Sequence, residues 1–378
     1  MSTPEGTRYN WRLVSLFVYV VVLVVLGIAS RRRDRSLVSD VPRHSGVRWL
    51  RQFAVQDGKN RQIAISADGS HVAAAVRSEA GLTIQIWSTA DGRLRDCWPV
   101  PDWTPSALAL SANGQFAACG LFRRRPDDKA WEAGVIVLNH PGNATGIDAR
   151  IAAGEQVIAS LAFSPDASRL AILAPTRLAV HDAPDWRQTI VLKPDAIGAD
   201  CVAFSPDGKS LASATDRDVK VLDLPSQKWR GQWKEPYGVH SVAFSPDGKQ
   251  LAAIVNDAPA TVWNLATSKP VAKLPIAADE AGFISMAGLI SFTKSGGKLL
   301  TFRTRDDIRS YGTPPAGKAS EGSVESWDLH DPQSAIVLIG PTAKVQTAVF
   351  CPTAGLLATA GAEGDAVITL WDLSDMSN

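Results

Sequence analysis

A short turn motif, repeated along the chain, constrains the fold more than any other feature of this sequence. Ser-Pro-Asp-Gly-Lys occupies residues 205–209 and again residues 245–249, and altered forms of it recur at five other places. A short apolar segment precedes each intact copy, as in Val202-Ala203-Phe204, and another follows it, as in Leu211-Ala212-Ser213. Proline presets φ for a turn, aspartate bonds to nearby amides, and glycine adopts the left-handed conformation. The motif predicts a tight β-hairpin, and repeated hairpins must stack to bury their faces.

From Val47 onward the chain consists of short apolar runs of strand length, separated by turns. The runs divide into seven units of about 40 to 58 residues, each with room for four strands. Such short runs suit strands that are buried on both faces. The sequence therefore predicts an all-β fold. The turns of the successive units begin at Ser66, Ser111, Ser164, Ser205, Ser245, Ser295 and Cys351.

The units resemble the WD-repeat (WD40) family of β-propellers. The resemblance depends on the Ser-Pro-Asp-Gly-Lys turns together with Trp327-Asp328 and Trp371-Asp372, and weaker forms occur at Trp87-Ser88 and Trp263-Asn264. It covers residues 47 to 375 and implies a seven-bladed propeller. The Gly-His pair that the family carries before each repeat is absent, although His240 lies close to such a position. We therefore expect more apolar blade cores than the family's Asp-His-Ser/Thr-Trp hydrogen-bond network would give.

The two ends of the repeat region predict how the ring closes. After Trp371-Asp372 six residues remain, which is too few for a fourth strand in the seventh unit. Residues 47–55 supply a spare strand at the other end. We expect this strand to pair as the outer strand of the last blade. The propeller then extends over residues 46–378, and the preceding segment joins it at the rim of the seventh blade.

Residues 13–29 form an apolar run without a charge, and they predict a single transmembrane helix. At 1.5 Å per residue this run is roughly 25 Å long, at the short end for a spanning helix. Residues 1–12 are a short N-terminal tail, with Tyr9 and Trp11 at the expected membrane interface. Residues 30–45 are a basic tether with no hydrophobic period.

The arginines that flank this run predict the orientation of the protein. Arg31, Arg32, Arg33 and Arg35 follow the run, whereas Arg8 and Arg12 precede it. By the positive-inside rule the propeller then faces the cytoplasm, beside the inner membrane. The alternative is a cleaved secretory signal, because Gly27-Ile28-Ala29 has the small residues of a cleavage site. That alternative places the propeller in the periplasm or outside the cell.

The residues with chemical potential do not assemble into a recognisable active site. The six histidines are scattered, no metal-ligand spacing occurs, and no phosphate-binding loop or nucleophile elbow is present. The four cysteines lie far apart and are expected to be small buried side chains. The formal net charge of +1 gives no indication of nucleic-acid binding. We therefore expect no catalytic, cofactor-binding or metal-binding residues, and no small-molecule substrate is evident.

Two insertions between the second and third strands of their units are the candidate functional regions. One runs from Leu121 to Glu132 in the second unit, and the other from about Arg303 to Ser323 in the sixth. In the WD-repeat family these connections emerge on the face that commonly binds partners, and arginine with tryptophan or tyrosine is enriched at interface hot spots. The alternative is that both are solvated, partly disordered loops. The candidate protein-binding residues are Arg123, Arg124, Arg125, Trp131, Arg305 and Tyr311.

These observations predict a membrane-tethered scaffold that binds other proteins and has no catalytic activity. The combination of tether and near-regular repeats is typical of a bacterial protein. Two alternatives remain: an exported module of the TolB-like type, and a propeller enzyme with an active site in its central channel. The exported module requires the opposite topology, and the enzyme requires histidine or carboxylate side chains that converge in the channel.

Overall fold

The computed structural model describes residues 47–55, 59–127, 130–140, 147–192, 200–236, 238–255, 260–274, 283–307, 321–332, 335–339, 345–361 and 367–376, and these residues alone are discussed below. The predicted tail, membrane segment and tether (residues 1–45) lie outside them. Within these ranges no helix has the length and apolar character needed to cross a membrane.

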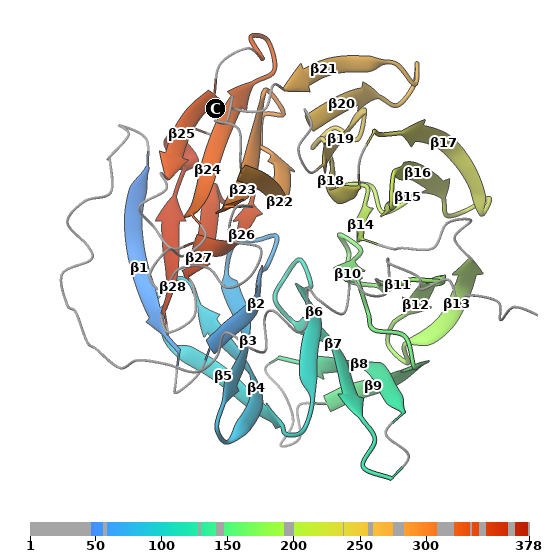
Figure 1. The fold of residues 1–378 in the computed structure, drawn as a ribbon, viewed down its shortest axis with the longest axis vertical. Coiled ribbons are helices and arrows are strands. Elements are labelled where there is room, and N and C mark those ends of the chain that lie inside the picture. Colours follow the sequence, from blue (N-terminus) through green and yellow to red (C-terminus); the bar gives the residue numbers. More distant parts are fainter. Residues whose placement is uncertain are drawn as a thin grey trace, which may run out of the picture. The chain divides into compact units, whose positions relative to one another are not determined.

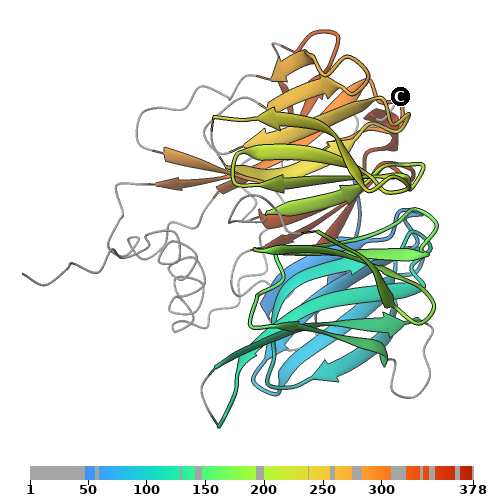
Figure 2. The ribbon, with the colours of Figure 1, turned by 90° about the vertical axis from the view of Figure 1, so that its right-hand side faces the viewer.

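In the described part of the chain the strands form seven antiparallel four-stranded sheets, or blades. The blades surround a common centre, and each sheet is twisted (Figures 1 and 2). The first strand of each blade contacts the first strand of the next, from β2 around to β26 and back to β2. The chain therefore folds as the all-β, seven-bladed propeller that the sequence predicts.

The strands of the first four blades follow one another along the chain. Blade 1 holds β2 (Lys59–Ile65), β3 (His71–Ser78), β4 (Gly81–Ser88) and β5 (Leu94–Val100). Blade 2 holds β6 (Thr104–Leu110), β7 (Phe116–Arg124), β8 (Trp131–Asn139) and β9 (Ile147–Gly154). Blade 3 holds β10 (Ser160–Phe163), β11 (Arg169–Ala174), β12 (Arg177–Asp182) and β13 (Arg187–Leu192). Blade 4 holds β14 (Cys201–Phe204), β15 (Ser210–Thr215), β16 (Asp218–Asp223) and β17 (Lys228–Lys234).

The last three blades complete the ring. Blade 5 holds β18 (Val239–Phe244), β19 (Gln250–Val255), β20 (Ala260–Asn264) and β21 (Pro270–Leu274). Blade 6 holds β22 (Phe283–Phe292), β23 (Lys298–Asp307), β24 (Glu321–Asp328) and β25 (Ala335–Ile339). Blade 7 holds β26 (Val345–Cys351), β27 (Leu356–Gly361), β28 (Val367–Asp372) and, as its outer strand, β1 (Arg48–Ala54). A short 3₁₀ turn, Ser374–Met376, follows β28.

The strand at the N-terminal end of the propeller closes the ring. β1 pairs antiparallel with β28, and Trp49 lies opposite Trp371. Phe53 is almost fully buried and lies with its ring centroid 6.0 Å from that of Trp87 in blade 1. Arg48 donates from Nη2 to the Asp372 carboxylate at 2.7 Å. The expected closure by the first strand is therefore present in the structure.

The repeated turn motif folds through the same hydrogen bonds in blades 4 and 5. Ser205 Oγ donates to the Asp207 carboxylate at 2.6 Å and accepts the Ser210 amide at 2.9 Å. The Asp207 carboxylate also accepts the Lys209 amide at 3.0 Å, and Gly208 has a φ of +68°. The residues from Ser245 to Gln250 repeat this arrangement with equal distances. The motif therefore determines the hairpin, because the serine and aspartate side chains accept the amides of the turn and glycine adopts the positive φ.

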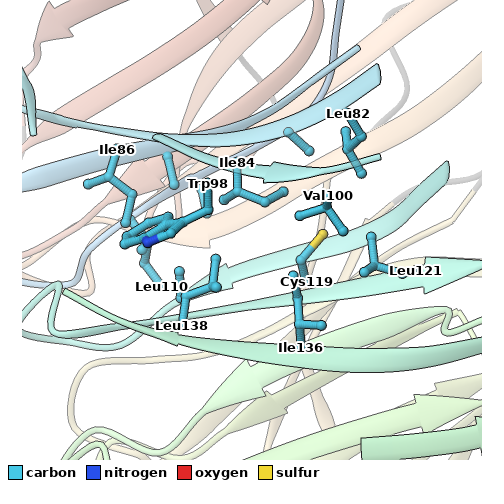
Figure 3. Close-up of a cluster of buried hydrophobic side chains, with 14 residues drawn as sticks. Leu82, Ile84, Ile86, Trp98, Val100, Leu110, Cys119, Leu121, Ile136 and Leu138 are labelled. Atoms are coloured by element: carbon cyan, nitrogen blue, oxygen red, sulfur yellow. The ribbon is translucent and has the colours of Figure 1, made fainter. Parts of the chain in front are cut away.

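Hydrophobic clusters between neighbouring sheets hold the blades together. Figure 3 shows the cluster in which side chains from β4 and β5 of blade 1 lie against those from β6, β7 and β8 of blade 2. Each fully buried aliphatic side chain of this kind contributes about 1.5–3 kcal/mol. The labelled members are Leu82, Ile84, Ile86, Trp98, Val100, Leu110, Cys119, Leu121, Ile136 and Leu138. Cys119, Cys201 and Cys351 are buried as expected, but Cys97 is exposed because it lies on the outward side of the outer strand β5.

The closing tryptophans keep part of the hydrogen-bond network of the resembled family. Trp327 Nε1 donates to Thr301 Oγ1 at 2.9 Å in blade 6, and Trp371 Nε1 donates to Thr359 Oγ1 at 2.9 Å in blade 7. In blade 5 the equivalent of these threonines is Ala253, and Trp263 stacks on another tryptophan, Trp233, at 5.5 Å. The blade cores therefore combine a tryptophan–threonine hydrogen bond, in blades 6 and 7, with apolar packing.

Candidate protein-binding surface on the loop face

The antiparallel order of the strands sorts the connections onto two faces of the propeller. In each blade the connections from first to second strand and from third to fourth strand lie at one end. We call this end the turn face, because it carries the Ser-Pro-Asp-Gly turns. The connections from second to third strand, and from one blade to the next, lie at the other end, which we call the loop face. Both insertions singled out from the sequence belong to the loop face.

The insertion in blade 2 is an extended hairpin and not the long loop that the sequence suggests. β7 continues to Arg124 and β8 begins at Trp131, so that half of the insertion is strand. Arg123 lies opposite Glu132, and Arg124 lies opposite Trp131. The Arg125 amide donates to the Ala130 carbonyl at 2.9 Å and continues the pairing toward the tip. Cross-strand pairs of opposite charge and of arginine with an aromatic ring stabilise such an extension.

Arg123 is held by an acidic partner and an aromatic partner at once. Its Nε donates to Glu132 Oε2 at 3.0 Å, and its guanidinium carbon lies 4.4 Å from the centroid of the Trp103 ring. About a third of each charged side chain is exposed, 34% for Arg123 and 35% for Glu132. The guanidinium is thus oriented by two contacts and still accessible to a partner.

The next residue of β7 makes a second cation–aromatic contact. The guanidinium carbon of Arg124 lies 5.0 Å from the centroid of the Trp131 ring, and Trp131 in turn lies 5.8 Å from the Phe122 ring. Arg124 is exposed, Trp131 is half-buried and Phe122 is buried. We call the six residues Trp103, Phe122, Arg123, Arg124, Trp131 and Glu132 the cation–aromatic cluster.

Blade 1 fixes the position of Trp103, which lies in the connection between the two blades. Arg77 Nη1 donates to the Trp103 carbonyl and to Thr104 Oγ1, both at 3.1 Å. The preceding residue, Asp102, has a positive φ of 66°, which turns the chain sharply before β6. The Trp103 side chain packs against the hydrophobic cluster between blades 1 and 2. The cation–aromatic cluster therefore combines residues of blade 2 with Trp103 from the connection between blades 1 and 2, and Trp103 packs against the hydrophobic cluster that these blades share.

The structure separates the candidate residues of the two insertions. Arg123, Arg124, Arg125 and Trp131 lie together on the β7–β8 hairpin. Arg305 lies within β23 of blade 6, opposite Glu321, so the stretch from Arg303 to Asp307 is strand and not loop. Blade 6 is not adjacent to blade 2. Tyr311 lies outside the described residues.

The fold brings together two groups of residues that are far apart in the sequence. Trp103 carries no local signal that links it to Arg123. On the turn face, the rings of His71 and His140 lie 4.9 Å apart, and His140 Nδ1 bonds to the Asp96 carboxylate. Burial and the nearby His140 lower the pKa of His71. In the described ranges, no group of three or more histidine, cysteine, aspartate or glutamate side chains has the arrangement to hold a metal ion.

Comparison with known proteins agrees with this architecture. The family model of the WD domain, G-beta repeat, matches residues 195–223, which include β14, β15 and β16 of blade 4. No curated protein matches the chain. The matched segment contains the intact turn at Ser205, and the same turn geometry recurs in blade 5. The described part of the chain is thus a seven-bladed β-propeller, and one of its blades contains a segment that matches the WD40 repeat.

Proposed function

We propose that this protein is a membrane-tethered, bacterial-type WD40 scaffold that binds other proteins and does no chemistry of its own. Residues 13–29 anchor it in the inner membrane, and the propeller lies in the cytoplasm. WD40 propellers typically serve as platforms for protein interaction. The cation–aromatic cluster on the loop face is the observation that carries the binding role.

The cluster has the properties of a binding hot spot. Arginine and tryptophan are the residues that contribute most to protein interfaces, and they act best when they are already ordered before binding. Arg123 and Arg124 are each oriented by an aromatic ring, and Arg123 is oriented by Glu132 as well. A partner that presents carboxylate groups near an apolar side chain would satisfy both parts of this surface.

The tether supports the scaffold role because it confines the propeller beside the bilayer. The sequence supports the anchor through the uncharged apolar run of residues 13–29 and the arginines that follow it. Confinement raises the effective concentration of the propeller for partners at the same membrane. Modest affinity at the loop face is then sufficient for assembly.

Crosslinking followed by purification from detergent-solubilised native membranes tests the binding surface. The first variant carries alanine at Arg123, Arg124, Arg125 and Trp131, and the second adds alanine at Arg305 and Tyr311. Truncation of one hot-spot residue costs about 2 kcal/mol or more, roughly 30-fold in Kd. We expect the first variant to lose the partners that crosslink to the wild-type protein.

A matched control variant carries alanine at Trp229 and Arg187, which are exposed residues on the outer strands of blades 4 and 3. It should keep every partner. Retention of all partners by the six-residue variant, with an unchanged thermal midpoint, would refute the binding surface. Loss that appears only with the second variant would move the site to blade 6.

A further inference from the structure

Two adjacent outer strands each expose a consecutive pair of large apolar side chains. On β1, Trp49 and Leu50 are 53% and 39% exposed, and on β25, Ile336 and Val337 are 47% and 42% exposed. Consecutive residues of a strand normally point to opposite sides, so that one of the two is covered. We call these four residues the apolar rim patch. The other described outer strands expose large apolar side chains singly, at Val191, Trp229 and Val271.

Each exposed pair lies beside a register shift of its strand. The register of β1 against β28 shifts between Trp49 and Arg51, so Leu50 has no directly opposite residue. A bulge of this kind re-aims the side chains beside it. On β25 the register shifts just after Val337. Register shifts occur in the outermost ladders of all seven blades, and the two pairs lie beside those of blades 7 and 6.

The two strands belong to neighbouring blades and border one core cluster. Val47, at the start of β1, packs against the cluster that contains Leu338 of β25. Figure 1 shows β1 and β25 on one side of the ring, with β13 and β17 on the other. Paired apolar residues on adjacent rims form a candidate contact surface, whereas single exposed apolar residues are ordinary in soluble proteins.

The patch lies where the N-terminal segment joins the propeller. Trp371 is near the turn-face end of β28, and Trp49 lies opposite it, so the chain enters β1 at the turn face. Ile336 lies opposite Ser326, which directly precedes Trp327, the equivalent of Trp371 in blade 6. Both pairs are thus at the same height of the ring. The tether of residues 30–45 precedes β1 in the sequence and therefore joins the propeller beside Trp49 and Leu50.

The length of the tether limits the distance between the apolar rim patch and the anchored segment. Sixteen residues reach at most roughly 55 Å even when fully extended. The tether therefore limits the distance between the anchored segment and the outer strand of blade 7 more tightly than the distance to any other part of the rim, and this favours contact of that strand with the bilayer. A tryptophan flanked by aliphatic residues and an exposed arginine is the composition found at membrane interfaces. Arg48, whose side chain is 63% exposed, stands beside Trp49.

We propose that the apolar rim patch rests on the lipid surface and holds the propeller on edge beside the membrane. This inference depends on the proposed anchor, because the tether supplies the local concentration that makes a contact by four side chains effective. Both faces of the ring then stay open to the cytoplasm, including the loop face with the cation–aromatic cluster.

Site-specific fluorescence in lipid vesicles tests the contact. The full chain, with Cys97 replaced by serine, is reconstituted in vesicles of phosphatidylcholine and phosphatidylglycerol. Single cysteines at Leu50→Cys or Val337→Cys carry an environment-sensitive dye. Val271→Cys and Val191→Cys, at exposed valines on the outer strands of blades 5 and 3, are the matched controls. The remaining native cysteines are buried. Lipids with a nitroxide on the acyl chain quench a dye that touches the bilayer.

We expect severalfold stronger quenching at positions 50 and 337 than at 271 and 191. In a second variant, Trp49→Gln with Leu50→Gln, quenching of the dye at position 337 should fall to the level of the controls. Equal quenching at all four positions in protein that stays in the vesicles after a high-pH wash would overturn the patch and leave the anchor intact. Loss of the protein in that wash would refute the anchor itself. Protection of positions 50 and 337 that rises with protein density, without quenching by lipid, would assign the patch to a second copy of the chain and overturn the lipid contact.

Discussion

Asp200 shows how one buried carboxyl group makes the stability of the propeller depend on pH. It directly precedes β14, and its Oδ2 accepts the Asp216 amide at 3.2 Å. Burial raises the pKa of Asp200 to about 6. The hydrogen bond from the Asp216 amide opposes this increase, and the negative charge of the Asp216 carboxylate adds to it. The unfolded chain has a pKa near 3.8 at this residue. The folded state therefore binds the proton more tightly than the unfolded state, and its stability contribution is complete below pH 3.8 and lost as the pH rises through about 6.

We expect Asp200→Asn to stabilise the protein at neutral pH and above. Asparagine keeps an oxygen for the Asp216 amide but carries no charge to bury, so the gain at neutral pH is roughly 1–3 kcal/mol. Below pH 4 the advantage over the wild-type protein should disappear. Thermal or urea unfolding across this range measures it, with the exposed Asp185→Asn as the matched control. A gain that is independent of pH would contradict the role of the charge.

At the scale of single elements, β1 is the strand that joins the N-terminal end of the propeller to its last blade. It contributes Phe53 to a cluster shared by blades 7 and 1, where Phe53 is 1% exposed. Gln52, its neighbour on the same strand, is exposed and lies opposite Thr369. The two residues allow the packing of the closing strand to be separated from its backbone pairing.

Phe53→Ala should destabilise the propeller by about 3–5 kcal/mol, because it leaves a cavity between the first and last blades. Gln52→Ala, which keeps the same backbone pairing, should cost less than about 0.5 kcal/mol. Urea unfolding gives both values, and hydrogen exchange of the β28 amides should increase in the first variant alone. Equal effects of the two substitutions would show that backbone pairing alone closes the ring.

A feature of this fold could be predicted from the sequence where the contacts that determine it join residues close together in the chain. The turns at Ser205 and Ser245 could be predicted because each hydrogen bond joins residues within five positions. The closing strand followed from the missing fourth strand after Trp371. The blade 2 insertion was interpreted as a loop because its arginines, proline and aspartates are typical of solvent-exposed chain. Its strand character depends on the register that sets Arg123 against Glu132, and the role of Trp103 depends on how two blades meet.

At the scale of the whole molecule, the topology of the proposed anchor would decide which compartment the loop face meets. Arginine residues after the apolar run favour retention of the following chain in the cytoplasm. The same propeller on the other side of the membrane would have a different set of partners. The prediction therefore concerns orientation and not fold.

Reporter domains fused after Asn378 test the orientation. We expect a fluorescent protein to be bright and a periplasmic phosphatase to be inactive, because the proposed orientation keeps the C-terminus in the cytoplasm. Replacement of Arg31, Arg32, Arg33 and Arg35 by glutamate removes the positive charge after the segment and should shift the balance of the two signals. Phosphatase activity of the wild-type fusion would favour the exported alternative.

The pairing of the first strand with the last has a consequence for synthesis. Arg48 and Asp372, which form an ion pair, are 324 residues apart, so the outer ladder of blade 7 cannot form until β28 has emerged from the ribosome. Until then β1 remains an unpaired edge, a state that invites strand exchange with another nascent chain. An early-emerging segment held at the bilayer would separate that edge from other ribosomes. The anchor would then assist assembly during translation and determine the localisation of the finished protein.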